Sequence, residues 1–208
     1  MLYTGSLEAA GQALPQDKKG KQEIQKNRRG ASNGYHAARQ TQHWEPPLDG
    51  WVKLNVDGSY HELTGEAGVG VVARDRCGTV IFTAWKYFEK YGSAAEAEII
   101  ACVEGLRWAN HWGLSQVIIE SDCARVISSL KNQLADRSEI DQIVGELRSL
   151  TQLMNEWKCS QIKRERNQVA NALASLARCC KLSTAWQGQV PACALPFLNT
   201  DCNLPMAS

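Results

Sequence analysis

Three strand patterns joined by short links constrain the fold of this chain more than any other feature. Apolar and polar residues alternate from residue 52 to residue 57, and residues 67–74 form a second pattern that contains glycines. A third pattern, over residues 79–89, is rich in aromatic and β-branched residues, which favour strands. Strands joined by such short links lie antiparallel and side by side, so this part of the sheet is predicted to be antiparallel.

Helical and strand patterns alternate over the rest of the chain. The predicted elements, in order, are a helix at about 94–112, a strand at 115–120, a helix that opens at Ser121-Asp122, a helix at about 138–154, a strand at 157–163 and a helix at about 167–180. A strand reached through a helix usually runs parallel to its neighbour. The sequence therefore predicts an α/β fold: a mixed five-stranded sheet of order 3-2-1-4-5, with strand 2 antiparallel, flanked by helices on both faces.

Local composition divides the chain into three parts. Residues 1–45 are polar and basic and lack an apolar period, which predicts a disordered arm; residues 46–182 form the folded domain; residues 183–208, with few periodic apolar residues, are interpreted as a C-terminal tail. Between Lys18 and Arg39 there are seven basic residues and one acid. This arm fits either weak phosphate binding or nuclear import, or a solubilising tail.

Global properties exclude several classes of protein. The net charge of +1 gives no overall attraction to nucleic acid, so any basic patch must be local. No apolar run is long enough to cross a membrane, and the N-terminus lacks the pattern of a secretory signal. The eight cysteines include no C-x-x-C pair, which favours reduced thiols over disulfides or zinc. We expect a monomer of the nucleus or cytoplasm that is neither secreted nor bound to a membrane.

Three acidic residues stand where the predicted elements would bring them together. Asp57 ends the first strand, Glu98 lies on the small-residue face of a helix that should pack on the sheet, and Asp122 follows the strand beside the first. Three carboxylates this close repel one another unless divalent cations neutralise them. Two of these residues also have an ordinary alternative role: Asp57 could belong to a hairpin turn, because Asp-Gly is common there, and Asp122 could be a helix N-cap.

The first strand carries an unexplained polar face. Lys53 and Asn55 share a face with Asp57, although a central strand should be apolar on both faces. A functional cleft over this end of the strand would explain the polarity, and so would an edge position in the sheet.

Four stretches occur in a fixed order along the chain. They are K-L-N-V-D-G-S (53–59), A-E-I-I-A-C-V-E-G-L (97–106), I-I-E-S-D-C (118–123) and R-E-R-N-Q-V-A-N-A-L-A (164–174). Together they resemble the ribonuclease H family, and specifically its plant, reverse-transcriptase-like and retrotransposon-related group. The resemblance covers about residues 51–180, each stretch in its expected structural context.

The resemblance implies an activity and a site. Members of the family hydrolyse the RNA strand of RNA–DNA hybrids with two magnesium ions, for which manganese is an alternative. The four ligand positions fall on Asp57, Glu98, Asp122 and Asn171. The family usually has Asp where this chain has Asn171, and many members carry His where it has Gln161. These departures leave a second hypothesis open: a weakened or inactive, transposon-derived module that binds nucleic acid without cutting it.

Hybrids of this kind are recognised mainly by shape and by 2′-hydroxyl groups rather than by sequence. The predicted nucleic-acid contacts are Asn55, Ser59, Arg74, Arg125, Arg164 and Asn167. For Arg74 and Arg125, a solvated surface cation is an equally good interpretation.

Overall fold

The computed structural model describes residues 43–131 and 139–202. Residues 1–42, which include nearly all of the predicted basic arm, therefore lie outside the described part. The strands of the described part are β1 (Val52–Tyr60), β2 (Ala67–Arg74), β3 (Val80–Phe88), β4 (Gln116–Ser121), β5 (Glu156–Gln161) and β6 (Thr184–Gln187). The helices are α1 (Ala94–His111), α2 (Ala124–Lys131), α3 (Glu139–Thr151), the short 3-10 helix η1 (Arg164–Arg166), α4 (Gln168–Cys180) and α5 (Leu195–Cys202).

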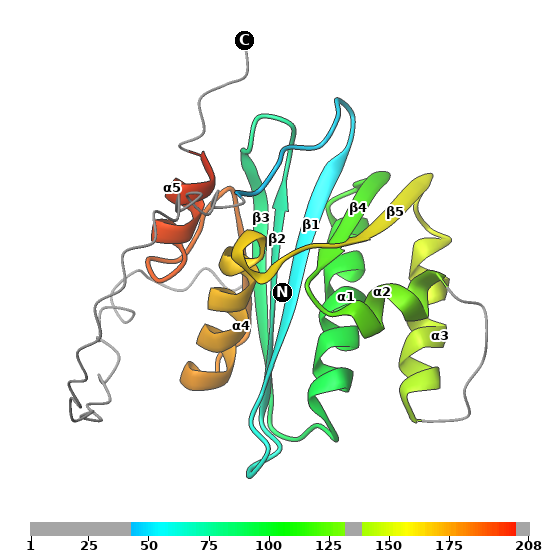
Figure 1. Cartoon of the computed structure of the whole chain (residues 1–208), viewed down its shortest axis with the longest axis vertical. Coiled ribbons are helices and arrows are strands. Elements are labelled where there is room, and N and C mark those ends of the chain that lie inside the picture. Colours follow the sequence, from blue (N-terminus) through cyan, green and yellow to red (C-terminus); the bar gives the residue numbers. More distant parts are fainter. Residues whose placement is uncertain (1–42, 132–138, 203–208) are drawn as a thin grey trace, which may run out of the picture. The chain divides into compact units, whose positions relative to one another are not determined.

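The strands form one mixed sheet of order β5-β4-β1-β2-β3-β6 (Figure 1). β1 pairs antiparallel with β2, and β2 pairs antiparallel with β3. On its other side β1 pairs parallel with β4, which pairs parallel with β5. The predicted α/β fold and the order 3-2-1-4-5 are thus confirmed. The structure adds a sixth strand, β6, which runs antiparallel to β3 at the edge.

The sixth strand and α5 come from the segment that was interpreted as a tail. β6 has only four residues, which is too short to display a clear alternation. Its Trp186 packs edge-on against Trp85 of β3, with ring centroids 5.0 Å apart. Phe197 and Leu198 of α5 pack on the same apolar cluster. Residues 184–202 therefore belong to the fold through tertiary contacts that their local sequence pattern does not reveal.

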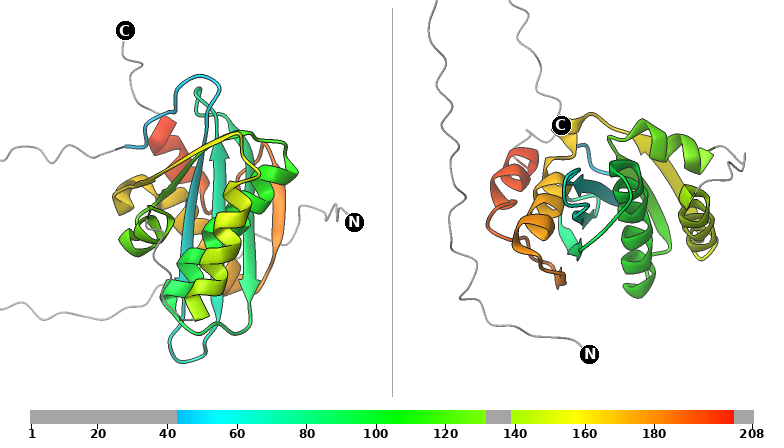
Figure 2. Two further views of the ribbon diagram at one scale, coloured as in Figure 1. Left: turned by 90° about the vertical axis from the view of Figure 1, so that its right-hand side faces the viewer. Right: turned by 90° about the horizontal axis from the view of Figure 1, so that it is seen from below.

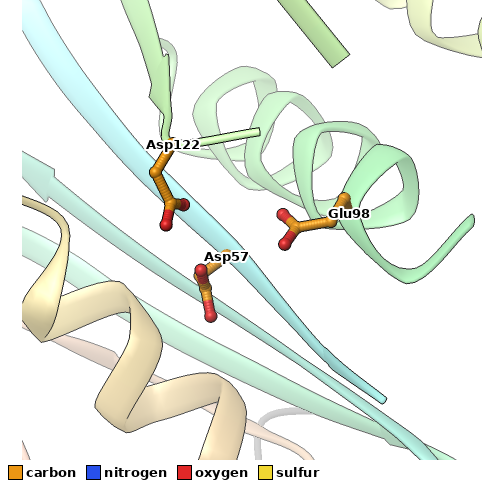
Figure 3. A group of neighbouring side chains, drawn as sticks. All are labelled: Asp57, Glu98 and Asp122. Carbon is orange, nitrogen blue, oxygen red and sulfur yellow. The ribbon is translucent and has the colours of Figure 1, made fainter. Parts of the chain in front are cut away.

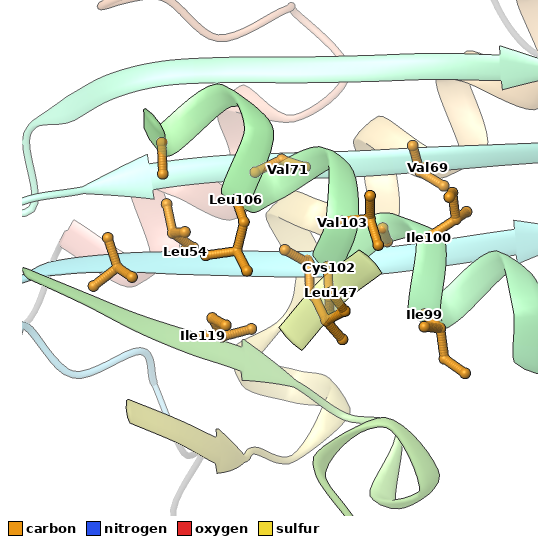
Figure 4. Packing of buried hydrophobic residues seen from close by; sticks show 14 of the residues in the cluster. Leu54, Val69, Val71, Ile99, Ile100, Cys102, Val103, Leu106, Ile119 and Leu147 are labelled. Carbon is orange, nitrogen blue, oxygen red and sulfur yellow. The ribbon is translucent and has the colours of Figure 1, made fainter. Parts of the chain in front are cut away.

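The helices cover both faces of the sheet, as predicted (Figures 1 and 2). α1, α2 and α3 contribute to one large apolar cluster, in which Leu106 of α1 lies among Leu54 of β1, Val71 of β2 and Ile119 of β4 (Figure 4). α4 and α5 contribute to a second cluster with Val72 and Trp85. Among the described residues, no helix is long and apolar enough to span a membrane.

Two glycines let the helices approach the sheet closely enough to build the site. A Cβ atom on Gly58 of β1 would lie 2.5 Å from the carbonyl carbon of Ala97 in α1. A Cβ atom on Gly70 of β2 would lie 2.3 Å from the carbonyl oxygen of Ala170 in α4. Because backbone atoms cannot give way as a side-chain end can, only glycine fits at either position. One approach sets the height of α1 over β1, and the other sets that of α4 over β2.

The closeness of α4 generates a prediction with a built-in control. Gly70→Ala should lower the free energy of unfolding by about 1–3 kcal/mol, because α4 must move off the sheet. Gly145→Ala in α3 should instead raise it by roughly 0.5–1 kcal/mol, since a helical alanine is favoured over glycine and its Cβ would meet no atom within 4 Å. Urea unfolding of both variants measures the two effects, and an unchanged Gly70→Ala protein would contradict this packing.

Candidate metal centre

Three carboxylates from separate elements converge at one point of the domain (Figure 3). Asp57 comes from β1, Glu98 from α1 and Asp122 from the turn that follows β4. One ligand oxygen from each lies within 4.8 Å of the others. The expected convergence is therefore present, and all the donor atoms are carboxylate oxygens. Oxygen ligands of this type suit Mg²⁺ and Mn²⁺ rather than softer metals.

Hydrogen bonds from neighbouring groups place two of these carboxylates. The backbone N–H of Gly58 donates to Glu98 Oε2 at 3.3 Å, a contact that the close approach of α1 permits. Asn167 Nδ2 donates to Asp122 Oδ1 at 3.1 Å and to the carbonyl oxygen of Val56 at 2.9 Å. A single buried amide thus fixes Asp122 to the strand that carries Asp57.

The alternative roles considered for Asp57 and Asp122, a hairpin turn and a helix N-cap, do not describe these residues. β1 continues past Asp57 as far as Tyr60, and Asp57 pairs with Gly70 inside the ladder, so Asp57-Gly58 is not a turn. At the start of α2 the N–H of Cys123 donates to the hydroxyl of Ser121, while the carboxylate of Asp122 turns toward the cluster. Both carboxylates are directed toward the shared site.

Burial and mutual repulsion keep protons on this cluster. Burial, then the charges of Glu98 and Asp122, raise the pKa of Asp57 to about 9, against a lowering by Arg164. Burial, then the charge of Asp122, raise the pKa of Glu98 to about 7, although the N–H of Gly58 opposes the shift. The site therefore favours positive charge near neutral pH. A divalent cation would supply that charge in place of the protons.

The sequence of the site matches a known family. Residues 55–177, more than half of the chain, match the family described as reverse transcriptase-like. The chain belongs to the reverse transcriptase-like family. A protein of Arabidopsis thaliana that is named as a ribonuclease H protein is 30% identical over an alignment of 140 residues, which covers 64% of this chain and 22% of that protein. The chain thus spans about a fifth of the length of this curated relative.

Solved structures of ribonucleases H resemble the chain. The type 1 enzyme of the halophilic archaeon Halobacterium salinarum gives a TM-score of 0.57 at 22% identity, covering 61% of this chain and 96% of that one. The N-terminal ribonuclease H domain of a Mycobacterium tuberculosis protein gives 0.59 at 20% identity, covering 62% and 94%. A type 1 ribonuclease H solved in complex with an RNA/DNA hybrid gives 0.57 at 19% identity, covering 64% and 99%. The domain is therefore ribonuclease H-like, as its four motifs indicated.

The fourth expected ligand position of this reverse transcriptase-like protein carries a neutral side chain. Asn171 lies in the first turn of α4, and its Oδ1 accepts a long hydrogen bond from Arg164 Nη2 at 3.5 Å. The charge of Arg164 acts on both Asp57 and Glu98, so Asn171 is linked to the border of the cluster through this guanidinium. Gln161, the other departure from the family pattern, is exposed at the end of β5.

Two of the predicted nucleic-acid contacts are enclosed by the protein. Asn55 and Arg74 are both 0% exposed, so the prediction that they contact nucleic acid is wrong. Arg74 is not a solvated surface cation either. Asn55 Nδ2 donates to Glu120, and Arg74 donates to Asn55 and to Asp201. These bonds also explain the polar face of β1, which is a central strand whose polar residues are paired in the interior. Neither a cleft nor an edge position is needed.

The other four predicted contacts are distributed differently. Asn167 is buried and holds Val56 and Asp122 through its amide nitrogen. Ser59 is half-buried, whereas Arg125 and Arg164 are exposed. Their contact with nucleic acid stays a prediction.

The sequence reasoning missed Arg178, whose Nε donates to the hydroxyl of Ser59 at 2.9 Å. It lies seven residues after Asn171, so the two share one face of α4 at a separation of two turns. That spacing was the available signal. Within the described part of the chain, no carboxylate forms a salt bridge with Arg125, Arg164 or Arg178. In this part of the chain, three guanidinium groups on the elements around the acidic cluster thus have no carboxylate partner.

The raised pKa values predict how the metal-free protein responds to pH. When a carboxyl has a higher pKa in the folded than in the unfolded chain, stability is greatest at low pH and is lost as the pH rises through the folded pKa. The free energy of unfolding without metal should therefore fall from about pH 5 toward pH 9, the pKa of Asp57. Asp57→Asn should reduce this fall, and the variant should be more stable than the wild type at pH 8 by on the order of 1–3 kcal/mol.

Chemical unfolding in a chelating buffer from pH 5 to pH 9 measures both proteins. Added Mg²⁺ should stabilise the wild type at pH 8 more than the variant, because ligand binding to the folded state shifts the equilibrium. Parallel pH profiles for the two proteins would contradict the raised pKa of Asp57.

Proposed function

We propose that this chain hydrolyses the RNA strand of RNA–DNA hybrids, with divalent metal ions held by Asp57, Glu98 and Asp122. The observation that carries the proposal is the group of three carboxylate oxygens within 4.8 Å, two of whose parent acids have raised pKa values. The ribonuclease H-like fold and the plant relative's name support the reaction class. The structure of a type 1 ribonuclease H with a hybrid supports the substrate class.

Each residue of the site then has a definite role. Asp57, the most buried of the three acids, would hold the ions together with Glu98 and Asp122, and Asn171 would contribute an amide oxygen. Bound ions of this kind activate water for attack on phosphorus and stabilise charge on the leaving 3′ oxygen. The N–H of Gly58 orients Glu98, and Asn167 orients Asp122.

Arginine side chains would hold the substrate beside these ligands. Guanidinium groups bind phosphate oxygens through paired N–H donors, and Arg164 lies close enough to the cluster for its charge to act on two of the acids. Arg178 donates a hydrogen bond to the hydroxyl of Ser59, and Ser59 lies two residues along β1 from Asp57. Arg164 and Arg178 would bind backbone phosphates of the hybrid that neighbour the phosphate to be cut.

A binding module that does not cut is the second candidate, because of Asn171. A neutral amide binds a hard cation more weakly than a carboxylate does, and Asn171 Oδ1 already accepts from Arg164. The arginines would still bind a hybrid if the second metal were lost. Cleavage, rather than binding, separates the two candidates.

The decisive experiment is a cleavage assay on a labelled hybrid duplex. The wild type should cut the RNA strand in Mg²⁺ or Mn²⁺ and leave 5′-phosphate and 3′-hydroxyl ends. Asp57→Asn should reduce the rate by at least about 100-fold, because a ligand of both ions is lost. Circular dichroism and binding to the uncut hybrid serve as controls for the fold. A wild type that binds the hybrid without cutting it would exclude the enzyme and leave the binding module.

Asn171→Asp should change metal dependence more than maximal rate. The additional carboxylate should lower the Mg²⁺ concentration for half-maximal cleavage roughly tenfold, because charged ligands bind hard cations more tightly. Without metal the same change should lower the melting temperature, since a fourth carboxylate adds repulsion. Titrations of Mg²⁺ against activity and against melting temperature test the two opposite effects. If neither curve moves, Asn171 does not face the ions.

Arg178 should contribute one phosphate contact to hybrid binding. Arg178→Gln should weaken binding about threefold to tenfold at low salt and reduce the slope of log affinity against log salt by about one. Lys181→Gln, three residues further on, is the matched control, because Lys181 forms a salt bridge with Glu66. Fluorescence anisotropy with a hybrid that is not cut in chelating buffer measures both slopes. Equal slopes for the two variants would remove Arg178 from the interface.

A further inference from the structure

A buried ionic network lies on the same face of the sheet as Asp57. At its centre is Arg74, whose Nη1 donates to Asp201 Oδ2 at 2.7 Å and whose Nη2 donates to Asn55 Oδ1 at 2.9 Å. The ring of Trp44 covers the guanidinium, with Cζ 3.9 Å from the ring centroid. Arg74 is 0% exposed and Asp201 is 8% exposed. This arginine is therefore enclosed by the protein, and its charge is balanced within the interior.

The network continues to β4, the strand that leads into Asp122. Asn55 Nδ2 donates to Glu120 Oε2 at 3.0 Å, and Glu120 Oε1 pairs with Lys53 Nζ at 2.7 Å. Asn55 and Glu120 are direct partners in the parallel ladder between β1 and β4. A chain of contacts thus runs from α5, through β2 and β1, to β4.

The same two strand positions precede two of the metal-ligand candidates. Asn55 stands two residues before Asp57, and Glu120 stands two residues before Asp122. Residues two apart on a strand point to the same face and lie about 6.7 Å apart, so Asn55 and Asp57 share a face of β1. Asp122 lies in the turn directly after β4. The bond between Asn55 and Glu120 therefore joins the strands one step before each delivers its carboxylate.

Two members of the network lie outside the matched part of the chain. The family match covers residues 55–177, whereas Trp44 precedes it and Asp201 follows it. The N-terminal lead-in and the C-terminal helix meet at Arg74 from opposite ends of the sequence. A buried guanidinium is tolerated only with a well-placed counter-charge, so Arg74 depends on Asp201 for its position.

We infer that Asp201 is a positioning residue for the acidic cluster: through Arg74, Asn55 and Glu120, α5 holds the ends of β1 and β4 in register. The effect on metal binding rests on the proposed function, but the coupling of α5 to the strand ends does not. Groups that orient metal ligands from outside typically change metal affinity 10-fold to 100-fold when they are replaced. Through Asp201, α5 thus helps to position the metal-ligand candidates.

The variant Asp201→Asn tests the coupling, and Glu104→Gln is its matched control. Both replace a nearly buried, ion-paired carboxylate by an amide, but Glu104 pairs with Lys86 and Arg107, away from β4. Asp201→Glu is the second variant, because it keeps the charge that balances Arg74 and so replaces Asp201→Asn if that variant does not fold. The full chain is used throughout.

Hydrogen exchange of the metal-free proteins is the first readout. After correction for global stability, the amides of residues 55–58 and 120–122 should exchange about tenfold faster in Asp201→Asn, less so in Asp201→Glu, and at the wild-type rate in Glu104→Gln. Unchanged exchange at these amides in both Asp201 variants would overturn the inference. This result does not depend on whether the protein binds metal or cuts RNA.

Manganese affinity, followed by electron paramagnetic resonance of free Mn²⁺, is the second readout. Asp201→Asn should bind Mn²⁺ about tenfold more weakly than the wild type, and Glu104→Gln should bind it equally well. Equal weakening by both variants would mean general destabilisation and would contradict a positioning role. A wild type that binds no Mn²⁺ would refute the proposed metal centre, and the exchange result would still decide the coupling.

Discussion

The burial of three neighbouring carboxylates, together with their mutual repulsion, is the constraint on which the candidate site depends. Their oxygens lie within 4.8 Å, and without a cation the protein accommodates them by keeping protons on Asp57 and Glu98. Such a cluster lowers the stability of the ionised protein, so a chain shaped only for stability would not assemble it. It becomes favourable when divalent cations replace the protons. The cost in the metal-free state is thus the physical observation that supports the proposed metal centre.

The surrounding fold brings the acids together by close approach rather than by flexible loops. Gly58 lets α1 come near enough for Glu98 to accept a backbone hydrogen bond, and Gly70 lets α4 come near enough to place Asn167 against Val56 and Asp122. The ion pair of Arg74 and Asp201 acts at the next position along the strands. Rigid elements on both faces therefore define the site, as precise metal coordination requires.

Much of this arrangement was predictable from the sequence, because it rests on strong local signals. The strand β1 and the helix that carries Glu98 follow from short-range periodicity. The strand order follows from the short links between β1, β2 and β3 and from the helices that connect the later strands. β6 and α5 were missed because a four-residue strand and a short helix with scattered apolar residues have no clear period. The burial of Asn55 and Arg74 was missed because their partners, Glu120 and Asp201, are distant in sequence. A basic residue near an acidic motif looks like a substrate contact until its counter-charge is seen.

The account's central claim is that the acidic cluster is a metal centre, and crystallography with manganese tests it most directly. Crystals of the full chain grown with Mn²⁺ should show anomalous density within about 2.2 Å of carboxylate oxygens of Asp57, Glu98 and Asp122, consistent with coordination of a small hard cation. A second peak on the side of Asn171 should strengthen when an RNA–DNA hybrid is bound. Absence of density between the three carboxylates, in crystals that bind Mn²⁺ elsewhere, would contradict the account.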